Sequence, residues 1–196
     1  MKEIIFASHN QGKIKEIRQI LTPIGIKVLS SDDITLPDIE ETGTTFEENA
    51  ALKALSIAKL KNVPCIADDS GLCVDVLDGR PGVYSARYAP NRDFKKAMQM
   101  LLAEMLETHN PNRSAHFSCV LVLAYPNGTY HAFEGRVDGI INQTPRGESG
   151  FGFDPIFIPD GYDKTFAELG AEVKNKISHR GRALEKFTTF LKEKGI

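Results

Sequence analysis

The sequence contains little cysteine, no excess of basic charge and no long apolar run. Its three cysteines, Cys65, Cys73 and Cys119, form no C-x-x-C motif and cannot all pair, so we expect a reducing, cytoplasmic setting. Lys and Arg number 24 against 26 Asp and Glu, which argues against a nucleic-acid-binding domain, because such domains rely on massed basic residues. No apolar run reaches the ~18 residues of a membrane helix, and the stretch at 4–7 is too short for a signal peptide core. Neither nucleic acid nor a membrane is therefore expected as a partner.

What the chain does contain is a mixture of strand and helix patterns. Its 196 residues, 41% of them hydrophobic, predict one domain spanning residues 1–196, with room for two lobes. The patterns predict strands at 4–7, 27–29, 65–67, 115–125, 129–137 and 156–158. They predict helices at 14–21, 45–61, 94–106 and 182–194, the second opened by a capping box of Thr45 and Glu48. Because Asn127-Gly128 marks a hairpin, we expect a mixed α/β sheet rather than a purely parallel one.

The first candidate site is the polar stretch Ser8-His9-Asn10-Gln11-Gly12-Lys13, which stands between a predicted strand and a predicted helix. Backbone N–H groups at a helix start bind phosphate, Gly12 allows a close approach, and Lys13 adds a positive charge. The alternative is a polar turn that binds nothing.

The second candidate is a group of carboxylates: Glu40 and Glu41 in a polar loop, Asp68 and Asp69 after a predicted buried strand, and Asp75. Mg²⁺ prefers carboxylate oxygens together with substrate phosphates, and a loop glutamate with a strand-end aspartate would supply them. Adjacent strand residues face opposite ways, so Asp68 and Asp69 are not expected to act as one unit. The alternative is that the glutamates are solvated and Asp68 caps a turn.

The third candidate is the segment Ser149-Gly150-Phe151-Gly152-Phe153-Asp154-Pro155. An aromatic ring in a glycine-rich turn can present its face to a flat ligand such as a base, and Asp154 would then accept a hydrogen bond or orient a neighbour. The alternative is that both rings fill the core, and for Phe153 core and site stand equal.

The fourth candidate is Lys174 with the run Ser178-His179-Arg180-Gly181-Arg182, just before the last predicted helix. Lys174 and Arg180 suit phosphate or carbonyl oxygens, and His179 can donate or accept a hydrogen bond. The alternative is a basic, solvated helix start.

Together and in this order, these segments resemble one family, the inosine triphosphate pyrophosphatases, also called noncanonical purine NTP pyrophosphatases. The resemblance covers nearly the whole chain and also includes the segments Glu40–Gly43, Phe46–Ala50, Ala67–Leu72, Pro81–Arg87 and Ile177–Gly181. It implies a two-lobed α/β fold with an elongated mixed β-sheet flanked by helices, and an active site in the cleft between the lobes. It also implies a homodimer that uses Mg²⁺ to hydrolyse ITP, dITP and XTP to the monophosphate and pyrophosphate, which cleanses the nucleotide pool.

The resemblance assigns roles to individual residues. The residues implied to hold the triphosphate are Ser8, His9, Asn10, Gln11, Gly12 and Lys13, and those implied to contact phosphate or sugar are Lys53 and Ser70. Glu41 and Asp69 would bind Mg²⁺, and Asp69 would also be the proton acceptor. The residues implied at the base are Phe151, stacked on it, Gly152, Phe153 and Asp154 around it, and Lys174, His179 and Arg180 at its oxygen edge. Many members have G-G-F-G-Y-D where this chain has Ser149-Gly150 and Phe153, so one possible hydrogen bond is missing.

The chemistry of the reaction agrees with these roles. Phosphoanhydride hydrolysis needs charge neutralisation and an oriented water more than covalent help. Deamination replaces an exocyclic amine by a carbonyl, so donors in the site reward inosine, whereas adenine would leave buried groups unpaired at ~1–3 kcal/mol each. The alternatives are a Maf-type dTTP or UTP pyrophosphatase, which the Phe151 loop and His179-Arg180 disfavour, and a nucleotide sensor without catalysis, which the acidic set disfavours. The sequence leaves open the preference among ITP, dITP and XTP, the choice of Mg²⁺ over Mn²⁺, the dimer interface, and whether Asp68 or Glu40 shares a role.

Overall fold

The computed structural model describes residues 1–195. Within these residues the strands are β1 (Glu3–Phe6), β2 (Lys27–Leu29), β3 (Cys65–Val74), β4 (Ser114–Ala124), β5 (Tyr130–Ile141) and β6 (Phe157–Pro159). The α-helices are α1 (Gln11–Leu21), α2 (Phe46–Lys61), α3 (Phe94–Glu107), α4 (Phe166–Leu169), α5 (Ala171–Ile177) and α6 (His179–Glu193). Short 3-10 helices lie at Thr22–Ile24, Asp75–Leu77, Gly82–Arg87, Pro90–Arg92 and Asp154–Ile156.

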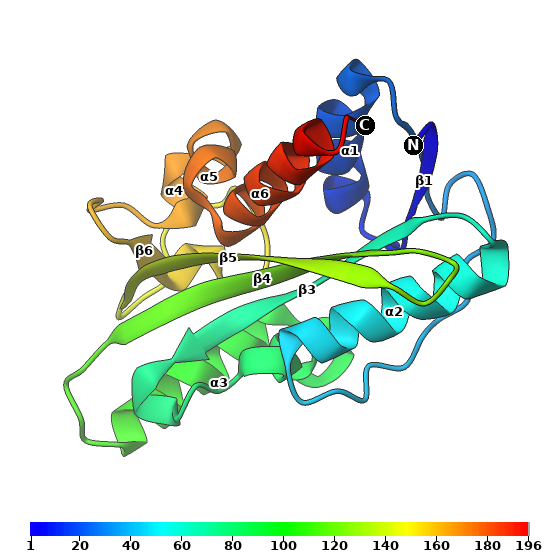
Figure 1. The fold of residues 1–196 in the computed structure, drawn as a ribbon. Helices are drawn as coiled ribbons and strands as arrows, with labels where there is room; N and C mark the ends of the chain where they lie inside the picture. The colour runs from blue at the N-terminus through cyan, green and yellow to red at the C-terminus, as the bar shows by residue number, and fades with distance from the viewer. Residues whose placement is uncertain (196) are drawn as a thin grey trace. The chain divides into compact units, whose positions relative to one another are not determined.

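Hydrogen bonding joins the described strands in one sheet with the order β2-β1-β3-β4-β5-β6 (Figure 1). Strand β1 runs parallel to β2 and β3, whereas β5 and β6 pair antiparallel. The expected mixed α/β fold, with helices beside the sheet, is therefore confirmed.

The described chain divides into two compact units. The first comprises Met1–Asp69, Val120–Phe133 and the end of the chain from Lys186, and the second comprises Ser70–Cys119 and Glu134–Glu185. Strands β3, β4 and β5 and helix α6 contribute residues to both. The interpretation of the whole chain as one domain with two lobes stays a prediction.

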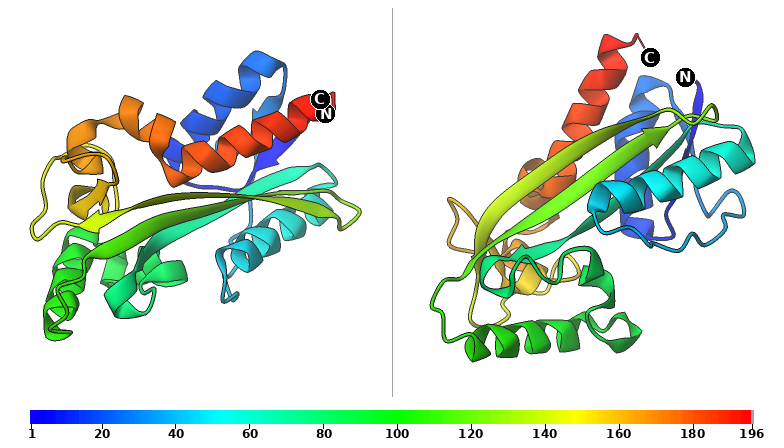
Figure 2. Two further views of the ribbon diagram at one scale, coloured as in Figure 1. Left: turned by 60° about the vertical axis from the view of Figure 1, so that its left-hand side comes forward. Right: turned by 60° about the horizontal axis from the view of Figure 1, so that its bottom comes forward.

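In the first unit, α1 and α2 cover opposite faces of the strands (Figures 1 and 2). Strand side chains alternate between faces, and one set (Ile5, Cys65, Ala67, Val120 and Val122) shares a buried cluster with Ala50, Ala54 and Ile57 of α2. The predicted capping box opens α2, because the Thr45 hydroxyl accepts a hydrogen bond from the N–H of Glu48 at 3.1 Å and the Glu48 carboxylate accepts one from the N–H of Thr45 at 3.2 Å.

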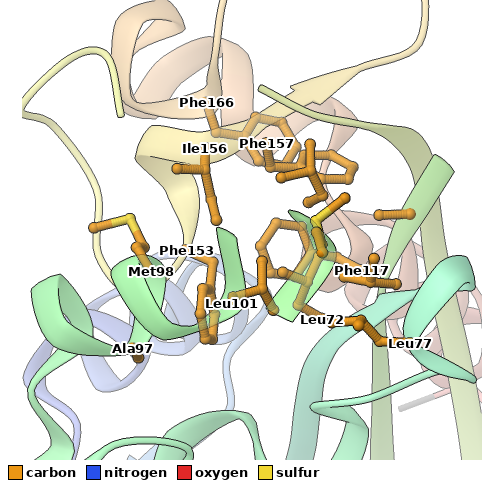
Figure 3. Close-up of a cluster of buried hydrophobic side chains, with 14 of the residues drawn as sticks. Leu72, Leu77, Ala97, Met98, Leu101, Phe117, Phe153, Ile156, Phe157 and Phe166 are labelled. Carbon is orange, nitrogen blue, oxygen red and sulfur yellow. The ribbon is translucent and has the colours of Figure 1, made fainter. Parts of the chain in front are cut away.

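The core of the second unit is rich in aromatic rings (Figure 3). Phe157 and Phe166 are fully buried with ring centroids 5.3 Å apart. Helix α3 adds the buried stripe Ala97, Leu101 and Met105, as its periodicity predicts, and Asp93 caps it by accepting from the N–H of Lys96 at 3.1 Å.

Several parts of the fold differ from the sequence prediction, including α1, which begins at Gln11 rather than residue 14, and β5, which ends at Ile141 rather than residue 137. Strand β3 does not stop at residue 67 but continues through Asp68 and Asp69 to Val74, buried along almost its whole length. Helix α6 begins at His179, three residues before the predicted start, and α4 and α5 were not predicted. In the part of the chain that the structure describes, no helix has the length and apolarity to cross a membrane.

Candidate active site

The N-terminus of α1 is capped by Asn10 and has no acidic residue in its first turn. The helix begins at Gln11. Gln11, Gly12 and Lys13 therefore belong to its first helical turn, although the sequence predicted that they lie in a loop before the helix. Asn10 is the N-cap, and its Oδ1 accepts from the N–H of Lys13 at 3.1 Å. The N–H groups of Gln11 and Gly12 remain as first-turn donors that the helix itself does not use. No acidic residue lies in this turn, so the positive end of the helix dipole stays available to an anion.

The other residues of the stretch 8–13 are partly engaged at the surface. The Ser8 hydroxyl accepts from the N–H of Asn10 at 3.1 Å, which shapes the entry to the helix. Exposed His9 lies 3.4 Å from the carboxylate of Asp38, and the Gln11 amide donates to Asp32 at 2.7 Å. Residues 10–13 therefore form the N-cap and the first turn of α1 and not a separate loop.

The side chains of Asp68 and Asp69 on β3 contact different helices. The Lys13 ammonium on α1 donates to the Asp68 carboxylate at 2.7 Å, and the Asn49 amide on α2 donates to the Asp69 carboxylate at 3.0 Å. Strand alternation between two covered faces produces this split, as the sequence predicts. Asp68 is thus neutralised by Lys13 and does not cap a turn.

Asp69 has a raised pKa. Burial is the main cause of its rise from 3.8 to about 6; the charges of Glu41 and Asp68 contribute to the rise, whereas Lys53 and the hydrogen bond from Asn49 oppose it. A carboxyl group with such a pKa can take up a proton near neutral pH.

Lys53 forms hydrogen bonds both to Glu41 and to the backbone of Asp68. Its ammonium donates to Glu41 at 2.7 Å and to the backbone carbonyl of Asp68 at 2.7 Å. Burial alone lowers the pKa of Lys53, but the charges of Asp68 and Glu41 outweigh it and leave that pKa above its ordinary value. The lysine is therefore a stable cation between the acidic loop and β3.

The carboxylates of Glu41 and Asp69 suit a magnesium ion whose remaining ligands come from substrate phosphates and water. Residues 1–195 contain no group of three or more His, Cys, Asp or Glu placed to hold a metal. Glu41 and Asp69 are two carboxylates whose like charges help to raise the pKa of Asp69, and a cation relieves that repulsion. Mg²⁺ usually takes only one or two protein carboxylates and fills its remaining positions with phosphates and water. Glu40 is exposed, in agreement with the solvated alternative for that residue.

Phe151 in the second unit presents an aromatic ring above two cations. The residue is 49% exposed, the Lys174 ammonium lies 4.3 Å from its ring centroid, and the Arg180 guanidinium lies 5.7 Å from it. Lys174 is itself buried and pairs with the Asp154 carboxylate at 2.5 Å. Asp154 also accepts from the N–H of Phe151 at 3.0 Å, so it orients both partners.

The turn around Phe151 depends on glycine. Gly150 has φ +78°, and a Cβ there would lie 2.2 Å from the Asp154 carboxylate. Gly152 has φ +64° and takes the chain on to Phe153.

Phe153 is a core residue, the first of its two open alternatives. It is 2% exposed and packs edge-on against Phe94 at 5.7 Å and Tyr88 at 6.4 Å between ring centroids. The ring therefore packs in the core behind the glycine-rich turn, and its assignment to the base pocket stays a prediction. A tyrosine hydroxyl at this depth would need its own partner.

His179 and Arg180 form the buried first turn of α6, so the alternative of a solvated helix start is wrong, and their role in binding stays a prediction. They are 5% and 6% exposed, and the His179 ring stacks on Phe117 at 4.8 Å with an interplanar angle of 12°. Gly135 on β5 makes this possible, because a Cβ there would lie 1.9 Å from the His179 carbonyl oxygen.

Comparisons with known proteins show the family of this chain. A profile of the Ham1 family matches residues 4–190. The chain belongs to the Ham1 family. It is 50% identical over 193 residues to a protein of Bacillus subtilis named dITP/XTP pyrophosphatase, covering 97% of this chain and 98% of that protein. A protein of the same name from Agrobacterium fabrum is 48% identical over 201 residues, covering 95% and 94%. The solved structure of a HAM1 protein from Coxiella burnetii matches with TM-score 0.94 and 42% identity, covering 98% of this chain and 100% of that one.

The Ham1 family membership confirms the resemblance inferred from the sequence. The predicted residues are divided between the two units, one set in each. The first set contains Ser8–Lys13, Glu41, Lys53 and Asp69, and the second contains Ser70, Phe151–Asp154, Lys174, His179 and Arg180. A shared cleft for the two sets stays a prediction.

Asn49 is the residue that sequence reasoning missed. It is fully buried and bonded to Asp69. The available signal was an amide on a helix turn whose next residues, Ala50 and Ala51, mark the buried face.

Proposed function

We propose that this Ham1 family chain is a hydrolase that splits noncanonical purine nucleoside triphosphates (ITP, dITP and XTP) into the monophosphate and pyrophosphate. The observation that carries the proposal is the acidic centre of Glu41, Lys53 and Asp69, which lies in the same unit as the helix N-terminus of α1. Relatives that match this chain over nearly its full length are named dITP/XTP pyrophosphatase, which supports the same substrates here.

The triphosphate is assigned to the first unit. The N–H groups of Gln11 and Gly12 point from the positive end of α1 and suit phosphate oxygens. Lys13 adds N–H donors at the same end, and its ion pair with Asp68 orients its ammonium group. Ser8, His9 and Asn10 complete the proposed binding stretch.

Glu41 and Asp69 are the residues that would hold Mg²⁺. The ion, when bound, neutralises charge that develops on the phosphates. Asp69 is assigned the second role of taking the proton of the attacking water, because its pKa of about 6 lets it be ionised yet basic near neutral pH. Lys53 keeps Glu41 in place beside β3.

The base is assigned to the second unit. The half-exposed ring of Phe151 offers a face for stacking, and Asp154 holds it. Lys174, His179 and Arg180 carry donors that suit the carbonyl of a deaminated purine. The amine of adenine would meet donors instead, at a cost of ~1–3 kcal/mol for each buried group left unpaired.

A substrate panel tests the proposed function. ITP, dITP, XTP, dTTP, ATP and GTP are each incubated with the protein and Mg²⁺, and the products are separated as pyrophosphate or phosphate. We expect pyrophosphate from the first three, with the other three at least about tenfold slower. Best activity on dTTP would instead support a Maf-type enzyme, and binding without pyrophosphate release would support a sensor.

The proposal also includes Mg²⁺ as cofactor, a homodimer and a cytoplasmic location. The three cysteines are all free and buried, which suits a reducing compartment. Pyrophosphate release after chelation with EDTA and then addition of Mg²⁺ or Mn²⁺ tests the cofactor. The molar mass from light scattering, measured as the protein elutes from a size-exclusion column, tests the dimer.

A further inference from the structure

Asn49 is a fully buried polar side chain that the proposed reaction leaves without a role. It is 0% exposed and lies in α2, whose other buried residues are alanines and an isoleucine. Burying an amide is costly unless both of its ends form hydrogen bonds. A purely apolar residue would pack here at lower cost, so the amide calls for an explanation.

Both ends of the Asn49 amide are used. Its Oδ1 accepts from the backbone N–H of Gly43 at 2.7 Å, and its Nδ2 donates to the Asp69 carboxylate at 3.0 Å. Because Oδ1 can only accept and Nδ2 can only donate, these two partners fix the orientation of the amide. One side chain thus connects the acidic loop, two residues after Glu41, with the carboxylate on β3.

The loop lies against α2 too closely for any side chain at residue 43. A Cβ on Gly43 would lie 2.6 Å from the Cβ of Glu48 and 2.8 Å from Oδ1 of Asn49. The next N–H group, of Thr44, donates to the Glu48 carboxylate at 2.6 Å. The loop is therefore held on the first turns of α2 by consecutive hydrogen bonds.

Lys53 makes a parallel connection about one helical turn further along α2. It follows Asn49 by four residues, so both side chains project from the same face of the helix. Lys53 joins Glu41 to the backbone of Asp68, and Asn49 joins Gly43 to Asp69. Two side chains of α2 therefore connect the same loop to the same strand by hydrogen bonds.

We propose that Asn49 is a positioning residue that holds Glu41 and Asp69 at a set separation and aims the Asp69 carboxylate at the metal. This inference rests on the proposed function, because it takes these two carboxylates as the metal ligands. A neutral donor suits the role, since it orients Asp69 without adding a positive charge that would repel the ion. Residues that orient metal ligands in this way typically contribute about 10–100-fold to metal affinity or activity.

Two substitutions separate the two hydrogen bonds of Asn49. Asn49→Asp keeps an oxygen for Gly43 but replaces the donor to Asp69 by a second carboxylate, whereas Asn49→Ala loses both hydrogen bonds. Asn62→Asp is the matched control, because it makes the same change on an exposed residue at the C-terminal end of α2. Circular dichroism and urea unfolding establish that each variant is folded, and Gly43→Ala, which forces the loop away from α2, serves if Asn49→Ala does not fold.

Four measurements follow: kcat and KM for dITP, the Mg²⁺ concentration for half-maximal rate, Mn²⁺ binding to the nucleotide-free protein by electron paramagnetic resonance, and amide hydrogen exchange at Gly43. For Asn49→Ala we expect weaker Mn²⁺ binding and a higher Mg²⁺ requirement, each by about tenfold or more, and faster exchange at Gly43. For Asn49→Asp we expect kcat at saturating Mg²⁺ to fall by about tenfold or more, with Gly43 still protected. Asn62→Asp should match the unmodified protein in all four.

The inference is overturned if Asn49→Ala keeps Mn²⁺ binding within about twofold of Asn62→Asp, or if Gly43 exchange is unchanged. Equal kcat in Asn49→Asp and Asn62→Asp would overturn the aiming of Asp69. If the unmodified protein releases no pyrophosphate from any deaminated nucleotide, the proposed function fails, while Mn²⁺ binding and Gly43 exchange still decide the role of Asn49.

Discussion

Replacement of Asp69 by asparagine should make the protein more stable at alkaline pH while abolishing its activity. Asp69 is buried and its pKa is raised to about 6, mainly by desolvation, from an ordinary value of 3.8. A neutral amide at this position would carry no such cost, so the direct comparison is between the unmodified protein and Asp69→Asn without metal. Functional residues of this kind are expected to reduce stability.

The sign and size of the effect follow from proton linkage. Between pH 3.8 and about 6 the native state holds the Asp69 proton while the unfolded chain releases it, so the free energy of unfolding falls as pH rises through this window. The stabilisation that the Asp69 proton gives to the folded state is fully present below pH 3.8 and is lost above about pH 6. A difference of about two pKa units corresponds to roughly 3 kcal/mol.

Urea unfolding in EDTA at pH 4 and pH 8 measures the effect. The free energy of unfolding of Asp69→Asn, minus that of the unmodified protein, should increase by roughly 2.5 kcal/mol from pH 4 to pH 8, because at pH 4 the unfolded Asp69 is already partly ionised. Comparing the two pH values cancels any constant change in packing. A difference that stays flat or decreases with pH would refute a raised pKa at Asp69.

Three further predictions concern other parts of the site. Lys53→Met removes the cation that joins the acidic loop to β3, so pyrophosphate release at pH 7 should fall by about tenfold or more, and an unchanged rate contradicts this role. Phe151→Ala should raise KM for dITP by roughly tenfold with little loss of stability, whereas Phe153→Ala should cost ~3–5 kcal/mol in urea unfolding; the reverse pattern would exchange their roles. Asp154→Asn leaves the buried Lys174 ammonium without its carboxylate and should cost ~3–5 kcal/mol, and a loss under about 1 kcal/mol, by the same urea assay, would show that the pair is dispensable.

Local features of the fold could be predicted because short-range chemistry encodes them. The capping box of Thr45 and Glu48 and the cap at Asp93 act over three residues, so their signals lie within one helix turn of sequence. The apolar stripe of α3 is likewise periodic in the sequence itself.

Strand β3 and helix α6 were predicted too short for a common reason. Polar residues such as Asp68, Asp69 and His179 usually mark an exposed boundary, and pattern reasoning ends an element there. In the structure each of these residues is buried in a regular element. For the two aspartates, partners distant in sequence satisfy the carboxylate: Lys13 lies 55 residues from Asp68, and Asn49 lies 20 residues from Asp69.

The sequence by itself determined the family, the mixed α/β class and the identity of most candidate residues, because these depend on residue types in a fixed order. Only the tertiary structure decided that Phe153 is core, that Lys174 pairs with Asp154, and that Asn49 bonds to Asp69. The physical reason is that burial and pairing are properties of the packed chain. The desolvation that raises the pKa of Asp69 exists only after α2 and β3 have come together.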